Sequence, residues 1–169
     1  MISIYGTVFI ILIGSLNHFL YNWLNKSKLA AFFFAVNEST WEHIKLALGP
    51  SFLWIIVEYH HYYNYQNYFI AKFIALLSII IVMPFLYYTI KILLKKSNIF
   101  IHISEFILTV VISQYIFNCI LTKGYSNIYV SHIGIIGVIL IFIMYMTLTY
   151  YPAKCILFKD PLTGKYGID

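Results

Sequence analysis

Charged residues are scarce in this sequence, and arginine is absent. Only 10% of the 169 residues are charged, whereas 62% are hydrophobic and 20% are aromatic. Soluble domains contain about 25% charged and about 45–50% apolar residues. The composition therefore excludes an ordinary soluble domain. Together with a mean hydropathy of +0.83, it predicts an integral membrane protein.

Cysteine is also scarce, and recognisable nucleophile motifs are missing. Cys119 lies in an apolar run and Cys155 follows another, so the two residues form neither a disulfide framework nor a CxxC metal motif. The 11 lysines outnumber 6 acidic residues and give a formal net charge of +5. Because the lysines are spread along the chain beside apolar runs, they indicate membrane topology, and we expect no nucleic-acid partner.

Long apolar runs predict an all-α, polytopic membrane protein with five spans. A hydrocarbon core about 30 Å thick requires about 20 helical residues per crossing. We expect one integral membrane domain over residues 1–169, with spans at about 3–24, 41–60, 70–94, 99–121 and 129–151. Residues about 29–40 contain an apolar run too short to cross and predict an interfacial segment. Residues 152–169 form a tail.

The distribution of lysines predicts the orientation. With the N-terminus outside, nine lysines lie inside and only Lys72 and Lys123 lie outside, which is the positive-inside pattern. We therefore expect an N-out, C-in protein whose tail is cytoplasmic. Basicity from lysine alone, with abundant Ile, Asn and Tyr, is typical of an AT-rich bacterial genome, so the expected location is the bacterial cytoplasmic membrane.

Polar side chains near the bilayer are the candidates for chemistry, because a charge at its centre costs about 2.5–3.5 kcal/mol. On the predicted cytoplasmic side these are His18, Glu38, Glu42 and His43. Histidines and carboxylates at one depth on different helices can bind a divalent metal or transfer a proton. We expect His18 and His43 as metal ligands and Glu42 or Glu38 as the catalytic carboxylate. Further polar intramembrane residues are Glu105, Gln114 and Glu58.

The same residues also admit a structural interpretation. Ser39-x-x-Glu42 is a capping box, and acidic residues suit the positive end of a helix dipole. His102 and Glu105 are three residues apart and can satisfy each other. Glu58-x-x-His61 resembles half of a di-iron carboxylate motif, but the sequence contains no second copy.

Two stretches of the sequence are distinctive: residues 36–45 read VNESTWEHIK, and residues 160–168 read DPLTGKYGI. They resemble a family of small Firmicutes membrane proteins with domain of unknown function 6512. Weaker matches are Asn17–Tyr21 in the first helix and Gln114 in the fourth. Asn22 departs from the pattern, which has an acidic residue before the tryptophan. The resemblance implies a small multi-pass membrane protein and no known activity.

Several functions remain open from the sequence. The primary expectation is an integral membrane protein of unknown molecular function with a polar site on the cytoplasmic side and the lipid bilayer as its partner. One alternative is a metal-dependent hydrolase or transferase that acts on lipid or isoprenoid substrates. A second is a small proton- or cation-coupled transporter, which predicts a continuous polar path from Glu42 to Gln114 and Glu58. A third is a scaffold without a pocket. The substrate, the metal and the oligomeric state stay open.

Overall fold

The computed structural model describes residues 2–94, 98–123 and 127–168, and these residues form α-helices joined by short segments. The helices are α1 (Ile2–Trp23), α2 (Lys28–Phe33), α3 (Thr40–Tyr62), α4 (Tyr68–Leu94), α5 (Ile99–Leu121) and α6 (Ile128–Thr147). The expectation of an all-α protein is confirmed. An isolated antiparallel bridge pairs Lys159 with Tyr166 in the tail.

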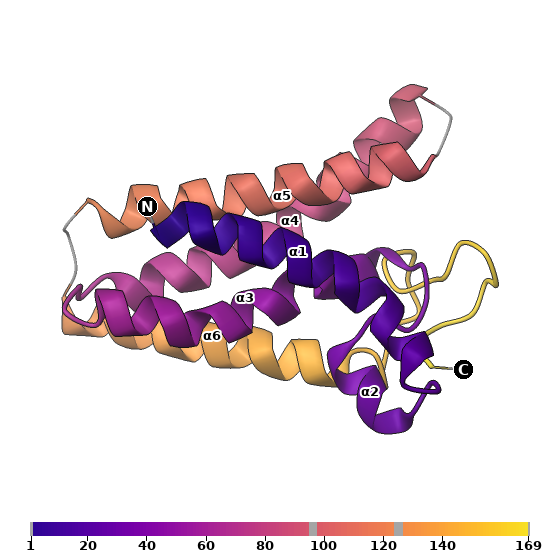
Figure 1. Ribbon diagram of the computed structural model, residues 1–169, viewed down its shortest axis with the longest axis horizontal. Helices are drawn as coiled ribbons and strands as arrows, with labels where there is room; N and C mark the ends of the chain where they lie inside the picture. Colours follow the sequence, from indigo (N-terminus) through magenta and orange to yellow (C-terminus); the bar gives the residue numbers. More distant parts are fainter. Residues whose placement is uncertain (1, 95–97, 124–126, 169) are drawn as a thin grey trace.

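The five long helices run along one common axis, and the short α2 lies at one end of the bundle (Figure 1). We call this the α2 end; it carries the end of α1, helix α2, residues 34–39 and the C-terminal tail after α6 (Figure 1). Helix α4 packs against both α5 and α6, and α1 packs against α3 and α5. Distant parts of the chain therefore meet at the α2 end.

Four of the helices are long and apolar enough to cross a membrane. They are Ser3–Trp23 within α1, then α4, α5 and α6. Large apolar side chains on these helices, such as Ile81, Phe85 and Ile136, are exposed on the outside of the bundle. This arrangement indicates a multi-pass membrane protein, because lipid can cover such faces.

Helix α3 differs from the other long helices and is not among these four. It carries Glu42, Lys45 and Glu58, and twelve of its 23 residues are buried. Pro50 lies inside it and cannot donate a backbone hydrogen bond to the carbonyl of Leu46. Gly14 of α1 lies against that carbonyl: a Cβ on residue 14 would be 2.6 Å from the oxygen of Leu46. Helix α1 thus covers the place where Pro50 interrupts the backbone hydrogen bonds of α3.

Glycines set the close approach of α6 to α4. A Cβ on Gly134 would clash with the backbone of Ile70, and a Cβ on Gly137 would clash with the ring of Phe73. Both glycines are buried. The spacing Gly134-x-x-Gly137 therefore has a packing role, in line with small residues at helix interfaces in membranes.

Two boundaries differ from those expected. The interfacial segment is helical only over Lys28–Phe33 and continues without helix to residue 39. The last helix ends at Thr147, whereas 151 was expected. Leu148 is the C-cap of α6, and the chain turns at 148–150 before it reaches Pro152.

Candidate functional site

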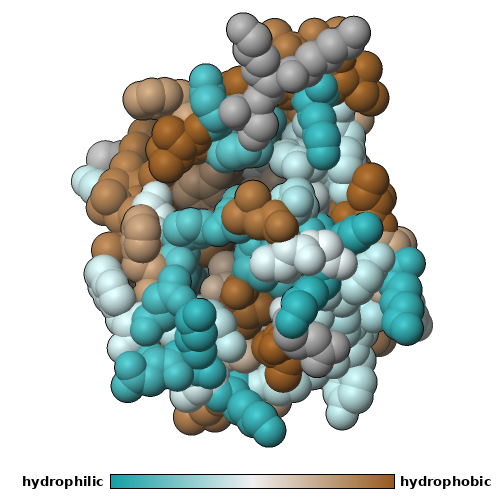
Figure 2. All heavy atoms as spheres, turned by 90° about the vertical axis from the view of Figure 1, so that its right-hand side faces the viewer, coloured by the Kyte–Doolittle hydropathy of each residue, from teal (hydrophilic) through white to brown (hydrophobic). Residues whose placement is uncertain are grey.

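The candidate site lies at the α2 end. Hydrophilic side chains are spread across much of this face, with hydrophobic ones between and around them (Figure 2). Here the end of α1 brings His18, the segment before α3 brings Glu38, and the first turn of α3 brings His43. The N-terminal turn of α5 adds His102. His18, residues 38–43 and His102 are far apart in the sequence, and the packing of α1, α3 and α5 brings them together.

The carboxylate of Glu38 lies between two imidazoles. Its Oε1 is 3.6 Å from Nε2 of His18, and its Oε2 is 3.5 Å from Nε2 of His43. All three side chains are partly exposed, between 27% and 40%. One acidic residue in a loop thus bridges a histidine of α1 and a histidine of α3.

A second pair extends this arrangement. The ring centroid of His102 lies 6.1 Å from that of His43, and its Nδ1 is 3.2 Å from Oε2 of Glu105. Glu105 is buried, at 5% exposure. We call His18, Glu38, His43, His102 and Glu105 the histidine row. The expected mutual pairing of His102 with Glu105 is confirmed.

The backbone determines the tautomer of His43. Its Nδ1 lies 3.0 Å from the carbonyl oxygen of Ser39, which can only accept, so Nδ1 carries a proton and donates it. In the neutral ring Nε2 is therefore an acceptor, and in the imidazolium it donates toward Glu38. The arrangement lets His43 take up a proton at the atom that faces the carboxylate.

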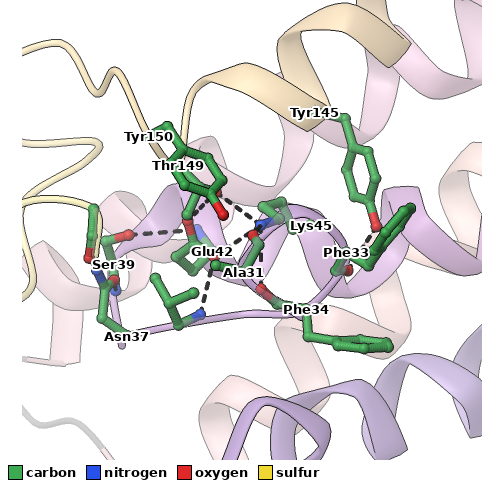
Figure 3. Close-up of polar contacts among 12 residues, drawn as sticks. Ala31, Phe33, Phe34, Asn37, Ser39, Glu42, Lys45, Tyr145, Thr149 and Tyr150 are labelled. Atoms are coloured by element: carbon green, nitrogen blue, oxygen red, sulfur yellow. Dashed lines mark hydrogen bonds and ion pairs between the residues drawn. The ribbon is translucent and has the colours of Figure 1, made fainter. Parts of the chain in front are cut away.

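Glu42 turns away from the histidine row and is buried, at 1% exposure. Its Oε2 accepts from the backbone N–H of Val36 at 3.1 Å, and its Oε1 accepts from the hydroxyl of Thr149 at 2.7 Å. Lys45 Nζ lies 3.4 Å from Oε2 (Figure 3). Ser39 also caps α3 by accepting from the N–H of Glu42. In these contacts Glu42 connects segment 34–39 to the turn that follows α6.

Lys45 completes this buried cluster. Its ammonium donates to the carbonyls of Ala31 at 2.9 Å and Phe34 at 3.2 Å, and to Thr149 Oγ1 at 2.7 Å (Figure 3). A buried ion pair is tolerated when hydrogen bonds satisfy the remaining donors and acceptors. From the sequence, the lysines, Lys45 included, predict only topology. The spacing of three residues between Glu42 and Lys45 is nevertheless typical of an ion pair on one helix face.

Two tyrosines hold α2 against the end of α6. Tyr145 donates from its hydroxyl to the carbonyl of Phe33 at 2.6 Å, and Tyr150 donates to the carbonyl of Lys28. Desolvation raises the pKa of the Tyr150 hydroxyl, so this group stays protonated and remains a donor. The short helix is thereby anchored at both of its ends.

The C-terminal tail folds back over the segment before α3. Asn37 Nδ2 donates to the carbonyl of Gly167 at 2.8 Å, and the backbone N–H of Trp41 donates to Leu157 at 3.0 Å. The rings of Trp41 and Phe158 lie 5.4 Å apart. Both stretches that carry the family resemblance therefore meet in space.

A cavity of about 150 Å³ opens beside the first part of the histidine row. His18 and Glu38 line it, together with Phe19, Tyr21 and Asn22 of α1. A molecule bound in this cavity would contact the imidazole of His18 and the carboxylate of Glu38, which also contacts His43.

The other predicted polar residues lie in different surroundings. Glu58 pairs with Lys72 of α4, both are buried, and the ammonium lies 4.2 Å from the centre of the Phe117 ring. Gln114 is buried, and its Oε1 has no hydrogen-bond partner. In the part of the chain that the structure describes, no hydrogen bond or ion pair joins Glu42 to these groups. The continuous path that a transporter predicts is not among the described contacts.

The geometry gives no ready metal site. Among residues 2–94, 98–123 and 127–168, no group of three or more His, Cys, Asp or Glu side chains is arranged to hold a metal ion. His18 and His43 are the expected ligands, and each contacts a different oxygen of Glu38. Their role as metal ligands stays a prediction.

Comparison with known proteins gives one match. The model of a family of unknown function, DUF6512, matches residues 2–168. Searches of curated proteins and of solved structures each find no match. Both stretches noted in the sequence, 36–45 and 160–168, fall within the matched range. The chain belongs to the DUF6512 family.

Proposed function

We propose that the chain is a five-span protein of the bacterial cytoplasmic membrane, with residues 1–169 as one domain. Helix α3 has 23 residues and would be about 34 Å long, enough to cross the hydrocarbon core. It runs along the same axis as the four apolar helices (Figure 1). Polar α3 side chains are tolerated because the other helices shield them from lipid.

The lysines support an orientation with the α2 end in the cytoplasm. Lys26 and Lys28 follow α1 at this end, and the tail adds Lys154, Lys159 and Lys165. Lysine near the membrane is enriched on the cytoplasmic side. In this orientation the histidine row faces the cytoplasmic surface of the membrane.

We further propose that the histidine row is an acid–base site for the polar headgroup of a lipid-like substrate. The observation that carries this proposal is the Glu38 carboxylate between Nε2 of His18 and Nε2 of His43, beside a cavity. Each oxygen of this carboxylate can accept a hydrogen bond from the imidazole nitrogen that it faces. His18 lines the cavity and exchanges a proton with the bound molecule. Glu38 orients the imidazole of His18 and stabilises the charge that His18 carries when it is protonated.

The remaining members of the row act behind this pair. His43 can accept a proton at Nε2 because its Nδ1–H is held by the carbonyl of Ser39. Glu105 contacts His102 in the same way that Glu38 contacts its histidines. The cavity favours a binding function over a scaffold, which predicts no pocket. Glu42 has a structural role in this proposal.

The test uses the whole chain in proteoliposomes of phosphatidylglycerol, phosphatidylethanolamine and a polyprenyl phosphate, with mass spectrometry of headgroup products. We expect turnover of one of these lipids, reduced by about 10²–10⁴-fold in His18→Asn and Glu38→Gln. His61→Asn is the matched control, because His61 lies at the end of α3 remote from the histidine row. Three outcomes would overturn the proposal: no product with folded wild-type protein, unchanged rates in both variants, or activity that depends on a stoichiometric bound metal.

A further inference from the structure

A second cavity continues from the first. It has a volume of about 320 Å³ and shares four lining residues with the cavity beside His18 and Glu38. The shared residues are Tyr21, Asn22, Val36 and Asn37. One hollow thus runs from the acid–base pair, along the end of α1, to the C-terminal tail.

The charges that line the far part of this hollow are Lys26, Lys165 and Asp160. Asp160 is 4% exposed, and its carboxylate is occupied inside the tail. Its Oδ1 accepts from the N–H of Leu162 at 3.0 Å, and its Oδ2 accepts from the hydroxyl of Thr163 at 2.6 Å. The two lysines are exposed. Among the described residues that line the second cavity, the accessible charges are therefore the two ammonium groups.

Hydrogen-bonded turns place both lysines. Lys26 has φ +51° in the turn after α1, and its N–H donates to the carbonyl of Tyr21 at 3.0 Å. Lys165 lies in the turn that begins at Asp160, whose N–H donates to the carbonyl of Lys165 at 2.9 Å. Two segments about 140 residues apart thus present one ammonium each to a single cavity from defined backbone positions.

An apolar flank on α1 adjoins the first part of the hollow. Phe19 lines that part and is 51% exposed, and the ring of Trp23, 65% exposed, stacks on Phe19 with the two centroids 6.0 Å apart. Exposed apolar groups at the end of a membrane-spanning helix lie where acyl chains begin. The site thus combines cationic groups with an apolar flank.

We propose that this cavity binds the phosphate of a net-anionic phospholipid, with Lys26 and Lys165 on the phosphate and the acyl chains along Phe19 and Trp23. This proposal names the class of lipid that the proposed acid–base site would act on. Only the reaction of the bound lipid rests on the proposed function; the binding of the lipid does not. The bound headgroup reaches from the two lysines toward His18 and Glu38. Lysines near a membrane surface attract anionic headgroups by electrostatics.

The test measures lipid binding to the detergent-purified full chain by native mass spectrometry. The probes are phosphatidylglycerol, phosphatidylcholine and inorganic phosphate. We expect phosphatidylglycerol to bind best and the double variant Lys26→Gln/Lys165→Gln to weaken it by about 10- to 30-fold. Lys154→Gln is the matched control; this lysine is also exposed on the tail but lines neither part of the hollow.

Equal binding of phosphatidylglycerol and phosphatidylcholine would overturn the proposal, as would an unchanged affinity in the double variant. Inorganic phosphate binding as tightly as phosphatidylglycerol would assign the site to free phosphate and overturn the lipid assignment. Binding and turnover are measured separately on the wild-type chain, so the two proposals can fail independently. Lipid binding without any turnover would overturn the proposed function and leave this inference intact.

Discussion

The buried pair of Glu42 and Lys45 gives the most direct test of the reasoning on stability. Replacement of Lys45 by methionine keeps the volume of the side chain but removes its ammonium. The carbonyls of Ala31 and Phe34 then lose a donor, and the hydroxyl of Thr149 loses a partner. Glu42 is left as a buried carboxylate without its counter-charge, since the pair is 1% exposed.

Removing one partner of a buried ion pair destabilises a protein by about 3–5 kcal/mol. For a chain of this size 1 kcal/mol corresponds to about 2–4 °C in Tm, so Lys45→Met should lower Tm by roughly 6–20 °C. The measurement is thermal unfolding in detergent. Lys154→Met is the control, because substitutions of exposed residues usually change stability by less than about 0.5 kcal/mol.

A double-mutant cycle separates the charge from the packing. Glu42→Gln in the Lys45→Met background removes the unpaired carboxylate while its amide keeps hydrogen-bonding capacity. We expect the double variant to be more stable than Lys45→Met alone, with a coupling energy of about 0.5–3 kcal/mol. A Tm for Lys45→Met within about 2 °C of wild type would refute the argument that this pair holds α2 and α6 to α3.

Two further predictions concern helix packing and topology. Gly134→Ala should destabilise the protein by about 1–3 kcal/mol, because its Cβ would clash with the backbone of Ile70; a Tm equal to wild type would contradict the close approach of α6 and α4. The topology prediction is tested with a membrane-impermeant maleimide on intact cells. The reagent should label Lys123→Cys, made in a Cys119→Ser/Cys155→Ser background, and should label native Cys155 only after permeabilisation. The reverse labelling pattern would contradict the proposed orientation.

Composition and periodicity determined the helical architecture. Apolar runs long enough to cross a membrane predict helices whatever their neighbours are, because lipid requires every backbone group to be bonded within the segment. Ser39 also marks the start of α3 to within a residue, because its hydroxyl accepts from the N–H of Glu42. The other half of the predicted capping box does not form, since the N–H of Ser39 donates to Asn37 Oδ1 and the Glu42 carboxylate accepts from Val36. The end of α6 has no such local signal: Pro152 constrains the residue before it, whereas the helix already ends at Thr147.

The roles of the polar residues depended on tertiary structure. Glu38 and Glu42 are four residues apart and would share a helix face, but α3 begins at Thr40 and leaves Glu38 outside it. Glu38 therefore reaches the histidines of α1 and α3, while Glu42 points into the bundle toward α6. The cap at Ser39 places Glu38 outside α3, but the partners of the two carboxylates depend on how α1, α3 and the turn after α6 pack together, which the sequence does not show.

The same reason applies to the ion pairs. Lys45 and Lys72 serve in the sequence as topology markers, yet both are buried against carboxylates. The partner of Lys72 is Glu58, on the other side of a turn between two antiparallel helices. Helix formation depends on residues within a few positions of each other, whereas these pairings depend on the register between helices. The sequence alone thus determined the helices and their membrane character, and packing decided which polar side chains meet.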